Sequence, residues 1–260
     1  MILAAGMGSR YGGLKQIEKI GPNGESLAEL TAYDAWKHGC TKIILITRED
    51  IQEEIKEKFS KISKKIKTKF VLQKNPIRNR VKPLGTGHAV LCAENHINEP
   101  FIVANADDYY GSQSIKMLIR FLQSDQRSAI MTFPLRQTLS IHGGVSRGVC
   151  KIDKNNNLTE IKETHDLNEF TEGDPPVSMN LWGFQPSIFG SLKKSYKKFI
   201  DEIKDNDSEF LLPGFVQEEI NQKKIQVKAL YSGEKWCGVT YKEDFEYTKG
   251  EILKKFQKGI

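Results

Sequence analysis

The sequence has no long hydrophobic run. Its 260 residues contain only short apolar stretches such as KIILIT and FIVANA, whereas a membrane-spanning helix needs roughly 20 consecutive apolar residues. The first sixteen residues also lack the basic segment and apolar stretch of a secretion signal. These absences argue against a membrane partner and predict a cytoplasmic protein.

Cysteine is scarce and scattered. Cys40, Cys92, Cys150 and Cys237 are far apart and form no CxxC pair. This pattern suits four reduced structural thiols better than a disulfide framework or a zinc site. Internal repeats and low-complexity linkers are absent as well, so residues 1–260 are expected to form a single domain.

The charge is moderately positive, at +6. The two densest basic segments, residues 60–69 and 193–198, alternate with apolar residues at helix or strand spacing. Such segments are usually solvated faces of the molecule. We therefore expect no nucleic-acid partner, while self-association into a homo-oligomer stays open.

Apolar strands alternate with amphipathic helices in the first half of the chain. Strands are predicted at 2–5, 42–47, 68–73 and 101–105. The helices between them are predicted at 26–38, after an Asp50 cap with Ile51, Ile55, Phe59 and Ile62 on one face, at 85–96, and around Ile115, Leu118, Ile119 and Leu122. This alternation predicts an α/β fold with a mostly parallel sheet and helices on both faces.

The pattern changes near residue 135. GVCKIDKNNNLTEIKE predicts two strands around an Asn-rich turn, and VSMNLWGF predicts another. Helices are expected at 186–203 and 208–221, then a strand near 225–231 and a C-terminal helix. We interpret residues 1–134 as a nucleotide-binding half and residues 135–260 as a smaller acceptor-binding lobe.

Four glycines and two cations follow the first strand, in MILAAGMGSRYGGLKQ. A P-loop is excluded because Leu14 precedes Lys15 and Gln16 follows it. A dinucleotide fingerprint is disfavoured because no helix begins directly after GMGSRYGG. What remains is a long loop whose backbone N–H groups, with Arg10 and Lys15, are suited to a triphosphate.

LAAGMGSRYGGLKQ resembles the signature of the sugar-phosphate nucleotidylyltransferases, which include glucose-1-phosphate thymidylyl- and uridylyltransferases. Further similar segments follow in family order: PLGTGHA at 83–89, NADDYYG at 105–111, SRGVCKID at 146–153, EIKET at 160–164 and VSMNLWGF at 177–184. The resemblance implies a Rossmann-like nucleotidyltransferase fold and an Mg²⁺-dependent enzyme of NDP-sugar and polysaccharide biosynthesis. Its partners would be a nucleoside triphosphate and a phosphorylated acceptor. The family usually carries a few residues before the first strand, so we expect a shortened strand or a start that lies upstream.

The resemblance assigns nucleotide contacts to the glycine loop and to the base-binding segments. Arg10 is expected at the pyrophosphate end and Lys15 near the α-phosphate, where its charge offsets that of the transition state. Gln73 can give a pyrimidine edge both a donor and an acceptor, or it is only a polar residue at a strand end. The expected nucleotide-binding residues are Ala5, Gly6, Gly8, Gln73, Gly85 and Thr86.

Asp107 is the expected Mg²⁺ ligand, because it follows a buried strand and Mg²⁺ prefers oxygen ligands. Asp108 either assists through water or caps the next turn. The family usually supplies a second carboxylate late in the chain, but here Gly238 occupies that place. Either Asp107 binds the metal with phosphates and waters, or Asp244 supplies a ligand, or the chain binds nucleotide without turnover.

Acceptor binding is assigned to Gly148, Glu163 and Asn180. Gly148 permits close approach of a sugar ring, and the two polar side chains can bind hydroxyls, although each is equally consistent with a structural role. A sugar 1-phosphate is the preferred acceptor. Two alternatives stay open: a cytidylyltransferase acting on a non-sugar phosphate such as phosphocholine, and a non-catalytic nucleotide-sensing module.

Overall fold

The computed structural model describes residues 1–7, 15–77, 80–203 and 205–257. Its centre is a nine-stranded sheet in which seven strands follow the order β10-β6-β9-β4-β1-β2-β3. Four of the six pairings along this path are parallel, and only those of β9 with β4 and β6 are antiparallel. The predicted α/β fold with a mostly parallel sheet is confirmed.

The first half of the chain supplies four parallel strands of this sheet. These are β1 (Ile2–Leu3), β2 (Lys42–Thr47), β3 (Lys67–Leu72) and β4 (Phe101–Asn105). The predicted strand at 2–5 is shorter than expected. Ile2 pairs with Leu45 and Ala104, so β2 and β4 both begin three residues before the level of β1.

Helix α1 (Leu27–Lys37) shows why the predicted boundaries are accurate there. Ser26 and Glu29 form a reciprocal capping box at its start. At its end, Gly39 has a φ of +100°, a conformation that favours glycine. Asp50, in contrast, caps no helix: helix η2 (Glu49–Ile51) has no side-chain cap, and the Asp50 carboxylate binds Arg48 instead.

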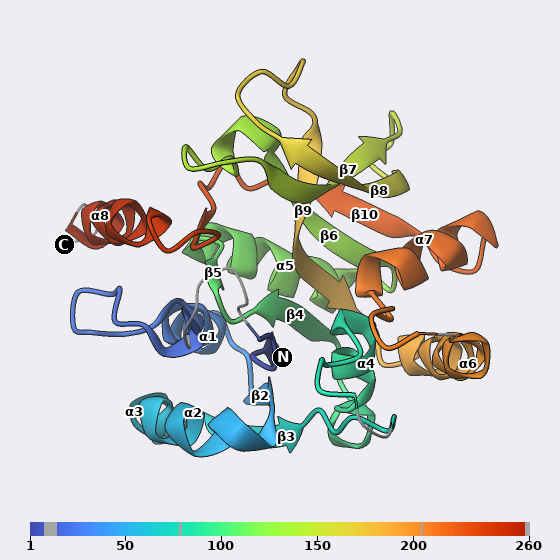
Figure 1. Ribbon diagram of the computed structural model, residues 1–260, viewed down its shortest axis with the longest axis horizontal. Coiled ribbons are helices and arrows are strands. Elements are labelled where there is room, and N and C mark those ends of the chain that lie inside the picture. The colour runs from blue at the N-terminus through green and yellow to red at the C-terminus, as the bar shows by residue number, and fades with distance from the viewer. Residues whose placement is uncertain (8–14, 78–79, 204, 258–260) are drawn as a thin grey trace.

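Helices cover both faces of the sheet (Figure 1). One face carries α1, α2 (Gln52–Lys58), α3 (Ser60–Ser63) and α5 (Ser112–Ser124), and the other carries α4 (Thr86–Leu91), α6 (Ile188–Glu202) and α7 (Leu212–Asn221). Strand residues alternate between the two cores: Ile2 packs in the first and Leu3 in the second. The predicted apolar face with Ile51, Ile55, Phe59 and Ile62 is buried, but it is divided among η2, α2 and α3 and does not belong to one helix. The predicted face of α5 is buried as expected.

The second half continues the same sheet. β7 (Val145–Ile152) and β8 (Leu158–Leu167) form the predicted pair, and β9 (Pro176–Phe184) lies between β4 and β6. The predicted strand near 225–231 is β10 (Val227–Leu230). It pairs with β6 (Ser128–Pro134), a strand that was not predicted from the sequence. The short strands β5 (Asp108–Tyr109) and β11 (Cys237–Gly238), also unforeseen, pair ahead of the C-terminal helix α8 (Asp244–Gln257).

Short 3-10 helices complete the described chain: η1 (Lys15–Ile17), η3 (Glu94–His96) and η4 (Leu135–Gln137). The segment predicted as one helix at 85–96 is therefore α4 followed by η3. No helix in the described ranges is long and apolar enough to cross a membrane.

Candidate active site

A cleft of about 780 Å³ lies at the carboxyl ends of β1, β3 and β4. This is the edge at which open α/β sheets bind ligands. Of the predicted site residues, Gly8 and Arg10 lie outside the described residues, and Asp244 does not line the cleft. All the others line it: Ala5, Gly6, Lys15, Gln73, Gly85, Thr86, Asp107, Asp108, Gly148, Glu163 and Asn180.

The start of the glycine loop is held by two side chains that the sequence did not single out. The Arg48 guanidinium donates to the carbonyls of Ala5 and Gly6, at 2.9 and 2.8 Å. Gln16 donates a further hydrogen bond to the Gly6 carbonyl, at 2.7 Å. Arg48 is itself oriented by Asp50. A cation directly after β2 was the available signal for this anchor.

Lys15 and Asp107 meet in the cleft. The Lys15 ammonium forms an ion pair with the Asp107 carboxylate, and it also lies 3.5 Å from the Val239 carbonyl. Their side chains are 18% and 25% exposed, so both remain accessible from the cleft. The sequence therefore named the two charged groups that the fold brings into contact.

Asp108 belongs to a buried polar network beside this pair. Its Oδ2 accepts from the Asn105 amide at 2.9 Å and from the Tyr110 hydroxyl at 3.2 Å. Asn105 in turn accepts from Asn180 at 2.7 Å, and Asn180 accepts from the Trp182 indole at 2.8 Å. A chain of hydrogen bonds thus leads from the core to the end of β4.

Asp108 is only 6% exposed. Burial, and after it the neighbouring Asp107 carboxylate, raise the pKa of Asp108 to about 7. Within the described chain the Asp108 carboxylate accepts hydrogen bonds from the side chains of Asn105 and Tyr110. No backbone N–H group of the next turn donates to it there, so the predicted alternative, a cap of that turn, is not observed. Asp107, which is more exposed, is the better placed of the two for a ligand.

Asn180 lies at an irregularity of the sheet. The register between β6 and β9 shifts between Ile130 and Thr132, and Asn180 has a φ of +60°. This unusual backbone turns its amide toward Asn105. Both ends of the predicted acceptor-binding amide therefore take part in the polar network.

Gly148 is tightly packed against its neighbours. A Cβ there would lie 3.0 Å from the Ile161 side chain and 3.3 Å from that of Ser178. The neighbouring strands thus approach one another closely beside the cleft. Space for a sugar ring is not the only reason for glycine at this position.

Gly238 faces Asp108 across the β5–β11 pair. A Cβ at this position would lie 2.6 Å from the Asp108 Oδ1 and 2.1 Å from the Trp236 ring. The Trp236 side chain therefore fills the space in which a second carboxylate would begin. The departure from the family pattern is a coupled feature of two residues.

The prediction that Asp244 could supply an alternative metal ligand is corrected, because its carboxylate is used in other hydrogen bonds. Its Oδ1 accepts from Ser140 at 2.7 Å, and its Oδ2 accepts from the backbone N–H groups of Thr240 and Tyr241 at 3.1 and 2.8 Å. These bonds stabilise the turn before α8, and Asp244 is buried outside the cleft.

The opposite end of the cleft holds the predicted base contacts. Gly85 has a φ of +94°, and a Cβ there would lie 2.7 Å from the Phe210 carbonyl, so glycine is required. The Thr86 hydroxyl accepts from the Leu212 N–H at 3.0 Å and so ties α4 to α7. Gln73 is buried beside them.

Glu163 and Arg147 line the part of the cleft that is predicted to bind the acceptor. The Glu163 carboxylate makes no hydrogen bond or salt bridge within the described part of the chain, and partial desolvation raises its pKa. Arg147 is buried, donates to the carbonyls of Ser146 and Thr138, and places its guanidinium 5.4 Å from the centre of the Trp236 ring. Neither Arg147 nor Trp236 was singled out from the sequence.

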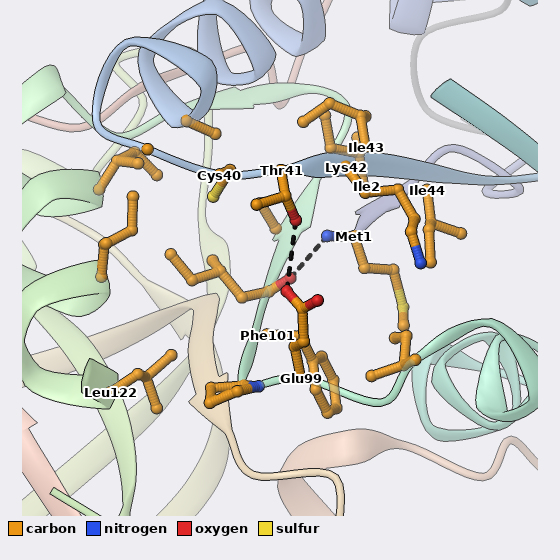
Figure 2. A pocket seen from close by; sticks show the side chains of 18 of the residues that line it. Met1, Ile2, Cys40, Thr41, Lys42, Ile43, Ile44, Glu99, Phe101 and Leu122 are labelled. Carbon is orange, nitrogen blue, oxygen red and sulfur yellow. Dashed lines mark hydrogen bonds between the residues drawn. The ribbon is translucent and has the colours of Figure 1, made fainter. Parts of the chain in front are cut away.

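A second cavity, of about 290 Å³, lies at the opposite end of the strands. It is bordered by Met1, by the early residues of β2 and β4 and by Cys40, and Glu99 accepts a hydrogen bond from Thr41 at its edge (Figure 2). It contains none of the predicted site residues. The cleft at the carboxyl ends is therefore the candidate active site.

The fold and cleft together define an α/β protein whose cleft lies at the carboxyl ends of parallel strands, where open sheets of this kind bind ligands. A family model described as Nucleotidyl transferase matches residues 1–247. The chain belongs to this family, as its sequence motifs predicted. No curated protein sequence matches the chain.

Solved structures of similar fold cover nearly the whole chain. An inositol-1-phosphate CTP transferase from T. maritima has a TM-score of 0.74 at 14% identity, covering 100% of this chain and 96% of that one. A UDP-glucose pyrophosphorylase complexed with UDP-glucose has a TM-score of 0.66 at 20% identity, with coverages of 98% and 97%. A CTP:phosphocholine cytidylyltransferase from Streptococcus pneumoniae has a TM-score of 0.67 at 15% identity, with coverages of 96% and 97%. At these identities the likeness establishes the fold.

Proposed function

We propose that this protein joins a nucleoside triphosphate to a sugar 1-phosphate, giving an NDP-sugar and pyrophosphate. The observation that carries the proposal is the Lys15–Asp107 ion pair. It lies in a cleft that Gln73 and Gly85 border at one end and Glu163 and Asn180 border at the other. A cation and a carboxylate between two polar subsites suit a reaction that unites two phosphorylated molecules.

In this reaction an acceptor phosphate oxygen attacks the α-phosphorus, and the bond to the β-phosphate oxygen breaks. Lys15 would lie against the phosphates and offset the charge that accumulates in the transition state, without transferring a proton. Asp107 holds the Lys15 ammonium in the cleft until phosphates arrive. Arg10, expected at the pyrophosphate, lies outside the described residues.

Asp107 fits the role of a magnesium ligand. Its carboxylate is partly exposed at the end of β4, and no group of three or more His, Cys, Asp or Glu residues in the described ranges is placed to hold a metal. Mg²⁺ is often bound by one or two carboxylates together with phosphates and waters, so a site with the single carboxylate of Asp107 is sufficient. When bound, the ion would neutralise phosphate charge. Asp107 would hold it, with the buried Asp108 behind.

One feature of the cleft, the covered face of Trp236, favours a sugar phosphate over phosphocholine, whereas the Glu163 carboxylate suits either acceptor. The Glu163 carboxylate has no internal partner in the described chain and can accept hydrogen bonds from hydroxyl groups. A quaternary ammonium group favours open aromatic faces. The Trp236 ring is already covered by the Arg147 guanidinium, so the observed packing favours a polyhydroxylated acceptor.

Release of pyrophosphate tests the proposal. The four ribonucleotides and dTTP are incubated with Mg²⁺ and a panel of sugar 1-phosphates, with phosphocholine and other phosphoamines as the competing class. Turnover with a sugar 1-phosphate supports the proposal, and preference for phosphocholine contradicts the acceptor assignment. Tight nucleotide binding without turnover across the panel favours the nucleotide-sensing alternative.

A further inference from the structure

Gln73 is placed at the cleft by its position just beyond β3. Its backbone N–H donates to the Thr47 carbonyl at 2.8 Å, which continues the parallel ladder by one residue. The residue is 8% exposed and lines the cleft. Its backbone is therefore fixed, and the direction of its amide decides what it offers a ligand.

Both hydrogens of the Gln73 amide have acceptors. Nε2 lies 3.0 Å from the Gly85 carbonyl and 3.2 Å from His88 Nδ1. A carbonyl can only accept, so the nitrogen, and not the oxygen, must face Gly85. Within the described chain the Gln73 Oε1 has no hydrogen-bond partner, and it is not fully buried from solvent. The oxygen is therefore the group that Gln73 presents to the cleft.

The orientation of His88 is fixed by three contacts. Its ring stacks on Tyr196, with centroids 5.0 Å apart and planes inclined by 8°. Its Nδ1 meets the amide donor of Gln73, so the ring hydrogen must be on Nε2, which lies 3.6 Å from Cys92 Sγ and donates to it. The same short segment at the start of α4 thus supplies both the Gly85 carbonyl and the His88 acceptor.

We propose that His88 is a positioning residue that, with the Gly85 carbonyl, fixes the Gln73 amide so that the base subsite accepts a nucleobase presenting an N–H group. This rests on the proposed function only in assuming that the cleft binds a nucleotide. The ring N–H of uracil, thymine or guanine and the amino group of cytosine or adenine all have the required chemistry. Removing that N–H leaves the oxygen of Gln73 unsatisfied.

Direct binding of nucleotides, without an acceptor, tests this inference by calorimetry. UTP and CTP are compared with 3-methyl-UTP and with the 4-dimethylamino analogue of CTP. ATP and GTP are compared with the 6-dimethylamino analogue of ATP and with 1-methyl-GTP. For the parent that binds best, blocking the N–H is expected to weaken binding by roughly tenfold, the effect of one lost hydrogen bond. The 5-methyl analogue of a pyrimidine adds bulk but keeps the N–H, and it should retain the parent affinity.

Two variants separate positioning from structure. His88→Phe keeps an aromatic ring for Tyr196 but removes the hydrogen-bond acceptor. It should weaken binding of the unmodified nucleotide by roughly threefold to tenfold. It should also reduce the ratio between the affinities for the unmodified and the N-methylated nucleotide. His88→Asn returns an acceptor near the Nδ1 position and should restore both. In a Gln73→Ala background His88→Phe should have no further effect on affinity, because its influence acts through Gln73.

Equal affinity for the parent and the N-methylated nucleotides would overturn the inference. So would an undiminished effect of His88→Phe when Gln73 is absent, or a loss with His88→Asn as large as that with His88→Phe. If the binding pattern is as expected but no acceptor supports turnover, the proposed reaction fails and this inference stands. If turnover occurs and N-methylation has no effect, the reverse holds.

Discussion

The Lys15 ammonium is paired with the Asp107 carboxylate, although the two residues follow different strands of the sheet. β1 and β4 are parallel neighbours, so the segments that follow them emerge at the same edge. Within the described residues, neither Lys15 nor Asp107 forms an ion pair with any other side chain. Phosphates and a cation would compete for these same two groups.

Removal of the Lys15 charge tests its part in catalysis. Lys15→Ala is expected to lower kcat and kcat/KM together by roughly 10²-fold or more, the scale seen when one preorganised electrostatic donor is removed. Nucleotide binding should survive because other groups contact the phosphates and base. Steady-state kinetics and calorimetry measure the two effects. Lys151→Ala, which removes an exposed lysine paired with Glu160, is the control. A rise in KM at unchanged kcat would show uniform binding instead.

Asp107→Asn tests the metal assignment, since it retains the side-chain shape but removes the charge. Activity should fall and the Mg²⁺ concentration for half-maximal activity should rise, because an amide is a poorer ligand for a hard cation. A magnesium titration of initial rates measures both. Asp201→Asn changes an exposed carboxylate on α6 and should leave the titration unchanged. Wild-type turnover and magnesium dependence in Asp107→Asn would place the metal elsewhere.

Local signals were sufficient where short-range chemistry decides the structure. The capping box of Ser26 and Glu29, and Gly39 after the helix, fixed α1 almost to the residue. The order of the strands brought the predicted cleft residues together, since each follows the carboxyl end of a strand or lies in β7, β8 or β9. These features depend on hydrogen bonds and periodicity that are visible in the sequence.

Features that depend on distant contacts were not visible. Arg48 lies after β2 and donates to the Ala5 carbonyl after β1. The Trp236 ring packs against Gly238. Neither contact can be predicted from the residues next to Arg48 or Trp236 in the sequence. Asp244 was an acceptable ligand by type, but its carboxylate is used by the turn that precedes α8. β6 was missed because its apolar residues directly follow an amphipathic helix.

Gly238 is expected to tolerate no side chain. Gly238→Ala should lower the free energy of unfolding by about 1–3 kcal/mol, because its Cβ would overlap the Trp236 ring and approach Asp108. Gly238→Asp should be worse, since it adds a second charge beside Asp108, and it should not rescue Asp107→Asn. Denaturant unfolding measures the stability change. Gly250→Ala, in α8 with nothing within 4 Å of the added Cβ, should be neutral or stabilising. Similar effects of both alanines would contradict this account.

Glu163 and Glu160 lie on the same strand and form a matched pair for the acceptor subsite. Glu163→Ala should raise the KM for the acceptor far more than the KM for the nucleotide, since lost ground-state contacts reduce binding. Glu160 pairs with Lys151 outside the cleft, so Glu160→Ala should change neither constant. Kinetics with each substrate varied in turn provide the measurement. An equal increase in both constants for Glu163→Ala would remove Glu163 from the acceptor site.

His88 should also make stability depend on pH. Burial lowers the pKa of His88 from its ordinary value of 6.5 to about 4. The titratable groups in contact with it, the Cys92 thiol and the Tyr196 hydroxyl, are neutral, because burial raises the pKa of each. The unfolded chain therefore binds up to one more proton than the native chain between these two pH values.

The free energy of unfolding should consequently fall as the pH is lowered from 6.5 toward 4, by up to about 1.4 kcal/mol per pH unit from this residue. Above pH 6.5 His88 should contribute no slope. Because carboxylates also titrate in this range, the measured quantity is the difference between wild type and His88→Asn in denaturant unfolding at several pH values. The wild-type advantage should shrink steadily below pH 6.5, whereas His142→Asn, which changes an exposed histidine, should follow the wild-type profile. Parallel curves for wild type and His88→Asn would show that His88 gains no proton on unfolding.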